Sequence, residues 1–158
     1  MENLSLILWR ERELLQTLLY RLEQEQLVLA SGRTRWLARA AREVEAVLES
    51  LRETELLRAV AADEAAAALG MTANPSLRVL AEHSEEPWRT ILLDHREAFV
   101  GYTQEIMELA SANRELLTAG YQAARETLLA LGDGASGYAP DGSAVADEPR
   151  QRLLDRSI

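Results

Sequence analysis

The chain has 158 residues, of which 47% are hydrophobic, 27% are charged and 5% are aromatic. This length is typical of one domain, and the abundance of Leu, Ala, Glu and Arg favours an all-α fold. The net charge of −9 argues against binding to nucleic acids or anionic membrane surfaces, and the lack of cysteine excludes disulfides, thiolate zinc sites and cysteine nucleophiles.

The first helix is expected over residues 2–29. Its apolar residues alternate in steps of four and three, which is the heptad pattern of a coiled coil, at Leu4, Leu8, Leu15, Leu18, Leu22 and Leu29. Glu11 and Glu25 occupy the two remaining positions of this seam. They either set the register of the helix or face solvent at an open groove, and catalysis is the least favoured of the three roles. The apolar run at residues 4–9 is too short for a membrane span and lacks the basic start of a signal peptide, so we expect a cytoplasmic protein without membrane insertion.

A turn at residues 30–32 separates the first helix from the second. Gly32 can take the left-handed conformation that ends a helix, and Ser31 or Thr34 can cap the next helix. The second helix is expected over residues 35–69, antiparallel to the first. Its predicted seam is Leu37, Ala41, Val44, Leu48, Leu51, Glu55, Arg58, Ala62, Ala65 and Leu69.

The main break in the folded part covers residues 70–86. Asn74 followed by Pro75 predicts a cap with proline at the first helical position of a short helix over residues 76–82. Leu77 and Leu80 of this helix are expected to face the hairpin. Ser84, Glu85, Glu86 and Pro87 then form a second helix-start signal.

The third long helix is expected over residues 87–131. Its seam comprises Trp88, Leu92, His95, Phe99, Tyr102, Ile106, Leu109 and Asn113. After Asn113 the apolar stripe steps by four residues and continues as Leu117, Tyr121, Ala124, Leu128 and Leu131. The distal stripe therefore faces a different direction, which indicates either bundle core or a surface for a partner.

Residues 132–149, which follow this helix, have few large apolar side chains, and a disordered C-terminal tail is predicted from residue 132 onward. Tyr138 is their one aromatic residue and precedes a Pro-Asp-Gly turn signal. The expected fold is thus an elongated antiparallel bundle of three long helices with a short connecting helix. Its division is a helical domain, residues 1–131, and a C-terminal tail, residues 132–158.

No arrangement of residues favours catalysis or a cofactor. A di-metal site in a helical bundle needs Glu-x-x-His pairs, but Leu80 and Leu92 stand three residues before His83 and His95. His95 is expected to be a hydrogen-bonded histidine at the core or its boundary. No phosphate-binding loop or nucleophile elbow occurs. We therefore expect neither an enzyme nor a metal site.

Three segments carry a resemblance to a known family. The opening helical hairpin is rich in Leu and Glu, the third helix contains Asn113-Arg114-Glu115-Leu116-Leu117, and the tail contains Gly137-Tyr138-Ala139-Pro140-Asp141-Gly142 before a final Ser157-Ile158. In their order and spacing these segments resemble the FlgN family of cytoplasmic flagellar export chaperones. The second segment is similar to the family's Asn-x-x-Leu-Leu stretch, and the third is similar to its Tyr-Gly-x-x-Gly signature.

The resemblance implies one function for the distal third helix and another for the tail. It implies that the distal third helix binds the C-terminal helices of hook-associated (FlgK/FlgL-type) proteins, which form the hook–filament junction, through Asn113, Leu116, Leu117, Tyr121, Leu128 and Leu131. It also implies that the tail, through Tyr138 and Gly142, delivers the complex to the flagellar export gate. A homodimer is possible. The alternative is an unrelated helical-bundle adaptor or a homodimeric coiled coil without a role in secretion.

Overall fold

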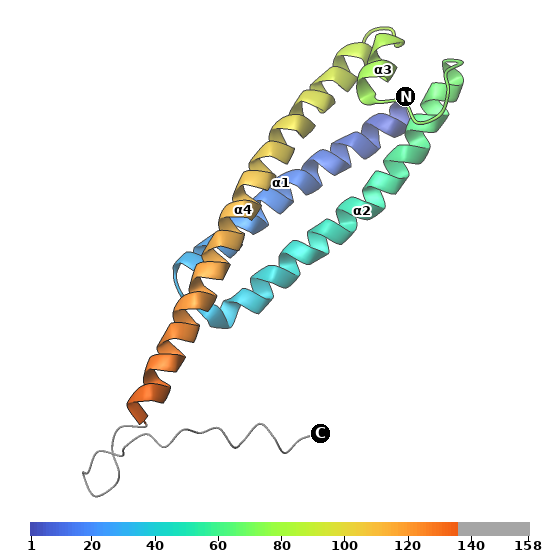
Figure 1. Ribbon diagram of the computed structural model, residues 1–158. Helices are drawn as coiled ribbons and strands as arrows, with labels where there is room; N and C mark the ends of the chain where they lie inside the picture. Colours follow the sequence, from blue (N-terminus) through green and yellow to red (C-terminus); the bar gives the residue numbers. More distant parts are fainter. Residues whose placement is uncertain (136–158) are drawn as a thin grey trace, which may run out of the picture. The chain divides into compact units, whose positions relative to one another are not determined.

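The computed structural model describes the backbone of residues 1–135 and the side chains of residues 1–132 (Figure 1). Every regular element in this range is helical, in the order α1 (Glu2–Ala30), the 3-10 turn η1 (Thr34–Trp36), α2 (Leu37–Ala68), α3 (Leu77–Glu82) and α4 (Trp88–Ala135). The all-α bundle of three long helices and one short helix is therefore confirmed. The chain divides into two compact units, Met1–Thr118 and Ala119–Ile158.

In the first unit, α1 and α2 form an antiparallel hairpin (Figure 1). Two ion pairs show that these helices run in opposite directions. Arg21 Nη1 lies 2.9 Å from Glu43 Oε2, near the turn, and Arg58 Nε lies 2.9 Å from Glu11 Oε2, further from it. The sequence order of one helix thus runs against that of the other.

The turn between α1 and α2 ends the first helix as predicted. Gly32 has a φ of 65°, a left-handed conformation that a side chain at Cβ disfavours. The Ser31 hydroxyl donates to the Val28 carbonyl at 2.9 Å and accepts from the backbone N–H of Arg33 at 3.4 Å, a residue that precedes η1. Neither η1 nor α2 has a side-chain cap, so the predicted capping by Ser31 or Thr34 is wrong.

The buried face of α2 differs in part from the predicted seam. The buried residues are Leu51, Thr54, Ala61, Ala62, Ala65 and Ala66, whereas Ala41, Glu55 and Leu69 are exposed. Burying the Glu55 carboxylate would cost free energy without a partner, while the neighbouring Thr54 hydroxyl is satisfied by the Ser50 carbonyl of its own helix at 2.8 Å. The pairs of alanines widen the buried face because α3 covers the end of α2 in the same core cluster.

The short helix α3 is held by a different cap from the one predicted. The Ser76 hydroxyl accepts a hydrogen bond from the Val79 backbone N–H at 3.2 Å, so Ser76 is the N-cap and Pro75 precedes the helix. Asn74 instead has a φ of 60°, and its backbone N–H donates to the Asp63 carboxylate. Leu80 is fully buried, as expected from its place on the apolar face.

The α4 helix runs alongside α1 in the same direction within the first unit. Arg12 pairs with Asp94, and the Asn113 amide donates to the Leu22 carbonyl, so both helices ascend in sequence together. All eight predicted seam residues, from Trp88 to Asn113, are buried or half-buried. The heptad alternation of this helix is therefore confirmed up to Asn113.

The core of the first unit consists of two clusters. One lies where α3 joins the long helices, and its buried members are Leu4, Leu8, Ala61, Ala62, Ala65, Ala66, Leu80, Ala81 and Leu92. The other is built on Leu18, Leu22 and Leu51, with half-buried residues of α4 such as Ile106 packed against it. Between these clusters the α1 seam carries a glutamate, Glu11.

Candidate functional site: exposed apolar side chains of α4

The distal residues of α4 predicted to bind a partner are exposed. In the first unit, Leu116 and Leu117 are 38% and 50% exposed. In the second unit, Tyr121, Leu128 and Leu131 are all more than 60% exposed. Every residue from Arg114 to Gly132 is exposed. These large apolar side chains therefore do not form a core within the described residues.

Asn113 does not belong to the exposed surface of distal α4. Its side chain is only 4% exposed, and its amide donates to the Leu22 carbonyl at 2.9 Å and to Glu25 Oε2 at 3.1 Å. The two acceptors belong to the last turns of α1. Asn113 thus joins α4 to α1 by hydrogen bonds at the end of the predicted seam. Glu25 is one of the two acceptors.

A small pocket lies beside Asn113 in the first unit. Its volume is about 220 Å³, and residues of α1, α2 and α4 line it: Leu22, Glu25, Leu29, Leu37, Ala110, Asn113, Arg114 and Leu117. Leu117 is the one residue of the predicted stripe that reaches this pocket. It therefore stands at the border between the packed part of α4 and its exposed part.

The seam residue Glu11 is buried rather than open to solvent. It is 5% exposed, and its carboxylate and the Arg58 guanidinium form an ion pair without hydrogen-bond geometry. The pKa of Glu11 lies above its usual value. Burial is the main cause, the Arg58 guanidinium opposes it, and the nearby Glu55 carboxylate adds to it. This pair joins α1 to α2 at one register. Of the three predicted roles, the structure supports the setting of register.

His95 is in the core, as predicted, but without the expected hydrogen bond. It is fully buried, and neither ring nitrogen has a hydrogen-bond partner among the described residues. Its ring meets Trp9 edge-on at 4.8 Å between centroids and lies 6.0 Å from Phe99. Burial lowers the pKa of His95, the Arg12 guanidinium lowers it further, and the Asp94 carboxylate opposes both. The ring therefore packs between aromatic side chains, while both nitrogens are buried without a hydrogen bond in the described part of the chain.

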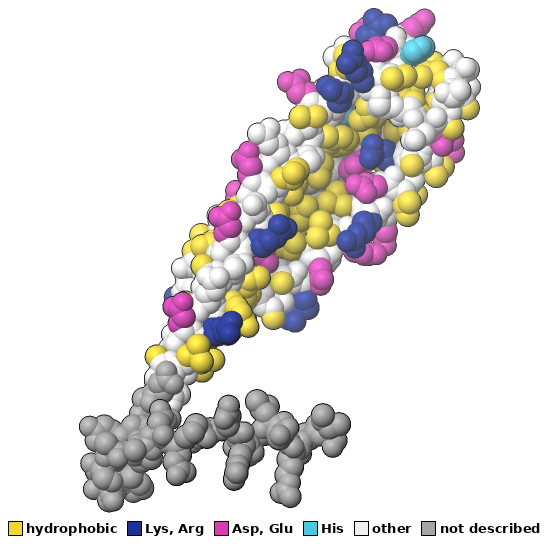
Figure 2. Space-filling view, viewed as in Figure 1, with side chains coloured by type: hydrophobic (Ala, Val, Ile, Leu, Met, Phe, Trp, Pro, Cys, Tyr) yellow, Lys and Arg dark blue, Asp and Glu magenta, His cyan; other side chains and the backbone are white. Residues whose placement is uncertain are grey.

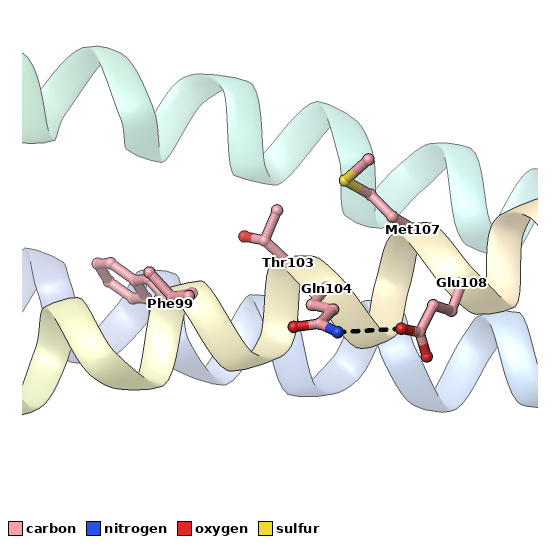
Figure 3. A pocket seen from close by; sticks show the side chains of 6 residues that line it. Phe99, Thr103, Gln104, Met107 and Glu108 are labelled. Carbon is pink, nitrogen blue, oxygen red and sulfur yellow. Dashed lines mark hydrogen bonds between the residues drawn. The ribbon is translucent and has the colours of Figure 1, made fainter.

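Sequence reasoning missed a second apolar surface on α4, within the first unit. A groove of about 550 Å³ is lined by Phe99, Val100, Thr103, Gln104, Met107 and Glu108, and we call it the Met107 groove. Met107 and Thr103 point toward the side on which α2 lies, and Gln104 donates a hydrogen bond to Glu108 at the outer edge (Figure 3). The sequence signal was the pair Val100 and Met107, which are seven residues apart and off the seam.

The predicted gate-binding residues, Tyr138 and Gly142, lie outside the described residues. Within the described part, no group of three or more acidic, His or Cys residues is placed to hold a metal ion. None of the described helices combines the length and the apolar character that crossing a membrane requires.

One of three comparisons with known proteins found a match. The family model described as FlgN protein matches residues 1–146. Comparison with curated proteins and with solved structures found no match. Because the family match covers nearly the whole chain, including all four helices, the chain belongs to the FlgN family of flagellar export chaperones.

Proposed function

We propose that this chain is a cytoplasmic chaperone that binds the C-terminal helices of hook–filament junction proteins and delivers them to the flagellar export gate. Family membership supports a role in flagellum assembly. The observation that carries the client-binding part is the exposure of Leu117, Tyr121, Leu128 and Leu131, four large apolar side chains on one helix. Apolar side chains repeated at helical spacing are the surface that a partner helix covers.

The physical basis of the proposal is mutual masking of apolar surface. The terminal helices of a filament protein are amphipathic, so they associate or are degraded if they stay exposed before assembly. Covering them with the α4 stripe removes apolar surface of both proteins from water, at about 25 cal/mol for each Å² buried. We assign the contact itself to Leu116, Leu117, Tyr121, Leu128 and Leu131.

Asn113 has a different role in this proposal. Its amide is engaged by α1, so its direct contact with a client stays a prediction. We propose that Asn113 positions α4, fixing the end of the packed segment from which the binding stripe continues. Tyr138 and Gly142 are proposed as the contacts with the export gate.

The test substitutes Leu117 and Leu128 together by Glu. Both side chains are at least half exposed, so the melting temperature should stay near that of the wild type, and co-purification with a hook–filament junction protein should be lost. The matched control is Leu56→Glu with Val60→Glu, two exposed apolar residues of α2 with the same change in charge.

Two outcomes contradict this assignment. If the Leu117/Leu128 variant unfolds at a much lower temperature, the stripe is core. If it binds the client as tightly as the control variant does, another surface carries the binding. A stripe that instead holds two copies together will show itself in sedimentation, because the variant will then be monomeric while the wild type is dimeric.

A further inference from the structure

The pocket beside Asn113 contains a buried polar atom without a partner. The Asn113 side chain lines this pocket of about 220 Å³ and is only 4% exposed. Its Oδ1 atom has no hydrogen-bond partner among the described residues. This atom sets the pocket apart from the hollow between α4 and α2, where hydrophobic side chains are bordered by Arg and acidic side chains alike and no single kind of occupant is selected (Figure 2).

The orientation of the Asn113 amide is fixed by its partners in α1. The Leu22 carbonyl and the Glu25 carboxylate both accept hydrogen bonds, so the amide nitrogen faces them and supplies both of its hydrogens there. The amide oxygen is left with its acceptor capacity unused. A buried acceptor without a donor costs free energy, which a suitable partner recovers. The occupant that Asn113 favours therefore carries a hydrogen-bond donor.

The other residues of the pocket favour a neutral donor on an apolar body. Glu25 and Arg114 both line the pocket, and their charges offset each other, so a charged group is not selected. The remaining lining residues are leucines and one alanine. Apolar side chains of this kind are buried most favourably by an apolar surface of the occupant.

The size of the pocket fits an aromatic ring. An apolar cavity of about 150 Å³ accommodates a benzene ring, and the pocket beside Asn113 is larger. A serine or threonine side chain is too small to fill it, and a carboxamide brings a second polar atom that needs partners of its own. Tyrosine combines an aromatic body with one hydroxyl, which can donate to Asn113 Oδ1 and accept from Arg114.

We propose that this pocket receives a tyrosine side chain of the client, whose hydroxyl donates a hydrogen bond to Asn113 Oδ1. Leu117 both lines the pocket and belongs to the exposed stripe, so a helix that covers the stripe passes the pocket. The inference rests on the proposed function, because it assigns the tyrosine to the same client. It adds Leu29 of α1 and Leu37 of α2 to the binding surface.

The probes are N-acetyl-tyrosinamide, N-acetyl-phenylalaninamide and N-acetyl-O-methyltyrosinamide. The second probe lacks the hydroxyl, and the third keeps its oxygen without the hydrogen. We expect the tyrosine probe to bind the full chain about tenfold more tightly than either of the others, because only its hydroxyl satisfies the buried acceptor. Titrations followed by NMR measure the three dissociation constants, and the signals that shift should include those of Leu29, Leu37 and Asn113.

Two variants test whether the probe binds in the pocket. Ala110→Leu places a larger side chain at a lining position and should weaken binding of the tyrosine probe about tenfold, because the added volume excludes the ring. The matched control, Ala46→Leu at an exposed position of α2, should bind the probe as the wild type does. Asn113→Leu should make the tyrosine and phenylalanine probes bind alike. If that variant does not fold, the O-methyl probe tests the amide oxygen in the wild type without any substitution.

Binding of the client separates this inference from the proposed function. Ala110→Leu should weaken binding of a hook–filament junction protein about tenfold, as expected when an aromatic anchor loses its pocket. The Leu117/Leu128 variant should lose that binding altogether. If the Leu117/Leu128 variant keeps the client, the proposed function fails, and the preference for the tyrosine probe in the wild type still reports on the pocket.

Three results overturn the inference while the client stripe stands. The first is equal binding of the three probes, or binding of none, because the pocket then does not select a phenol. The second is an Ala110→Leu variant that loses the tyrosine probe but holds the client as tightly as Ala46→Leu does. The third is a wild-type dimer, seen in sedimentation, that the tyrosine probe dissociates, because the tyrosine then belongs to a second copy of the chain.

Discussion

At the scale of single residues, the buried polar groups determine how the helices align with one another. Three of them lie on seam positions where a heptad pattern expects apolar side chains: Glu11 on α1, and His95 and Asn113 on α4. Asn113 is satisfied in part by α1, and Glu11 is ion-paired with α2. His95 packs against the rings of Trp9 and Phe99. A shift of either helix by one heptad would separate these groups from their neighbours and would therefore cost free energy.

His95 makes the stability of the bundle depend on pH. Its pKa in the folded chain lies below the usual value of 6.5, so the folded state binds fewer protons than the unfolded state as pH falls below that value. Stability is therefore full above pH 6.5 and is lost as the solution becomes more acidic, by at most about 1.4 kcal/mol for each pH unit.

Replacing His95 by Phe, which keeps the ring packing, should remove this component. Urea unfolding between pH 7.5 and 5 measures the slope, and the difference between wild type and variant isolates His95 from the carboxylates. An unchanged slope in His95→Phe would show that the buried ring is not the titrating group.

The pairing of Glu11 with Arg58 predicts unequal effects of removing its two members. Arg58→Ala leaves the Glu11 side chain, which is 7% exposed, without its cation, and this should lower the free energy of unfolding by about 1–3 kcal/mol, given that Arg58 is itself partly exposed. Glu11→Leu with Arg58→Ala completes the apolar seam and should recover most of that loss. Chemical denaturation of the three proteins measures both effects, and a double variant less stable than Arg58→Ala would contradict the account.

At the scale of elements, much of the structure was predictable because it depends on local chemistry. The bounds of α1, the left-handed Gly32 and the α4 seam from Trp88 to Asn113 follow from periodicity and glycine conformation. Ala61 and Ala66, which are buried outside the predicted seam of α2, and the Ser76 cap were not predictable in the same way. The burial of these alanines depends on what α3 covers, and the cap of α3 is Ser76, two residues after the predicted Asn74.

The candidate site was also predictable only in part. Periodicity identified Leu117, Tyr121, Leu128 and Leu131, and their exposure agrees with a surface. It placed Asn113 with them, because the sequence does not reveal that an amide on the seam will find acceptors on α1. The Met107 groove escaped notice because off-seam apolar residues look like ordinary exposed side chains until the neighbouring helix is placed.

The continuous α4 helix predicts a gradient of amide protection. Up to Asn113 its seam is packed against α1, while residues 114–132 are all exposed. A helical segment of this length without tertiary packing is only marginally stable in water. Hydrogen exchange should therefore be slow before Asn113 and become faster beyond it, and client binding should slow exchange over residues 117–131. Uniform protection along α4 in the free chain would contradict this expectation.

At the scale of the whole molecule, the proposed function separates two interactions along the chain. Distal α4 carries the client stripe, and Tyr138 is proposed as an anchor for the export gate. Aromatic anchors often dominate small interfaces, with losses of about 2 kcal/mol or more on truncation. Tyr138→Ala should accordingly weaken gate binding and client secretion while leaving client affinity and the melting temperature unchanged.

Separate titrations of client and gate proteins against Tyr138→Ala measure this division. Leu117→Glu with Leu128→Glu serves as the reciprocal control, because it should lose the client and keep the gate. Equal losses of both affinities in Tyr138→Ala would mean that one surface serves both partners. No loss of either would remove Tyr138 from the mechanism.

The central position of α1 has a consequence for mutational tolerance. Glu11 and Arg21 of α1 engage α2, while Arg12 and the Leu22 carbonyl engage α4, so consecutive turns of one helix serve two neighbours. A substitution on α1 therefore disturbs two interfaces, whereas one on the outer side of α2 or α4 disturbs none. In a saturation mutagenesis experiment scored by abundance, α1 should accept the narrowest range of amino acids of the three long helices. The client stripe of α4 should be permissive for abundance and restrictive only when the score is motility.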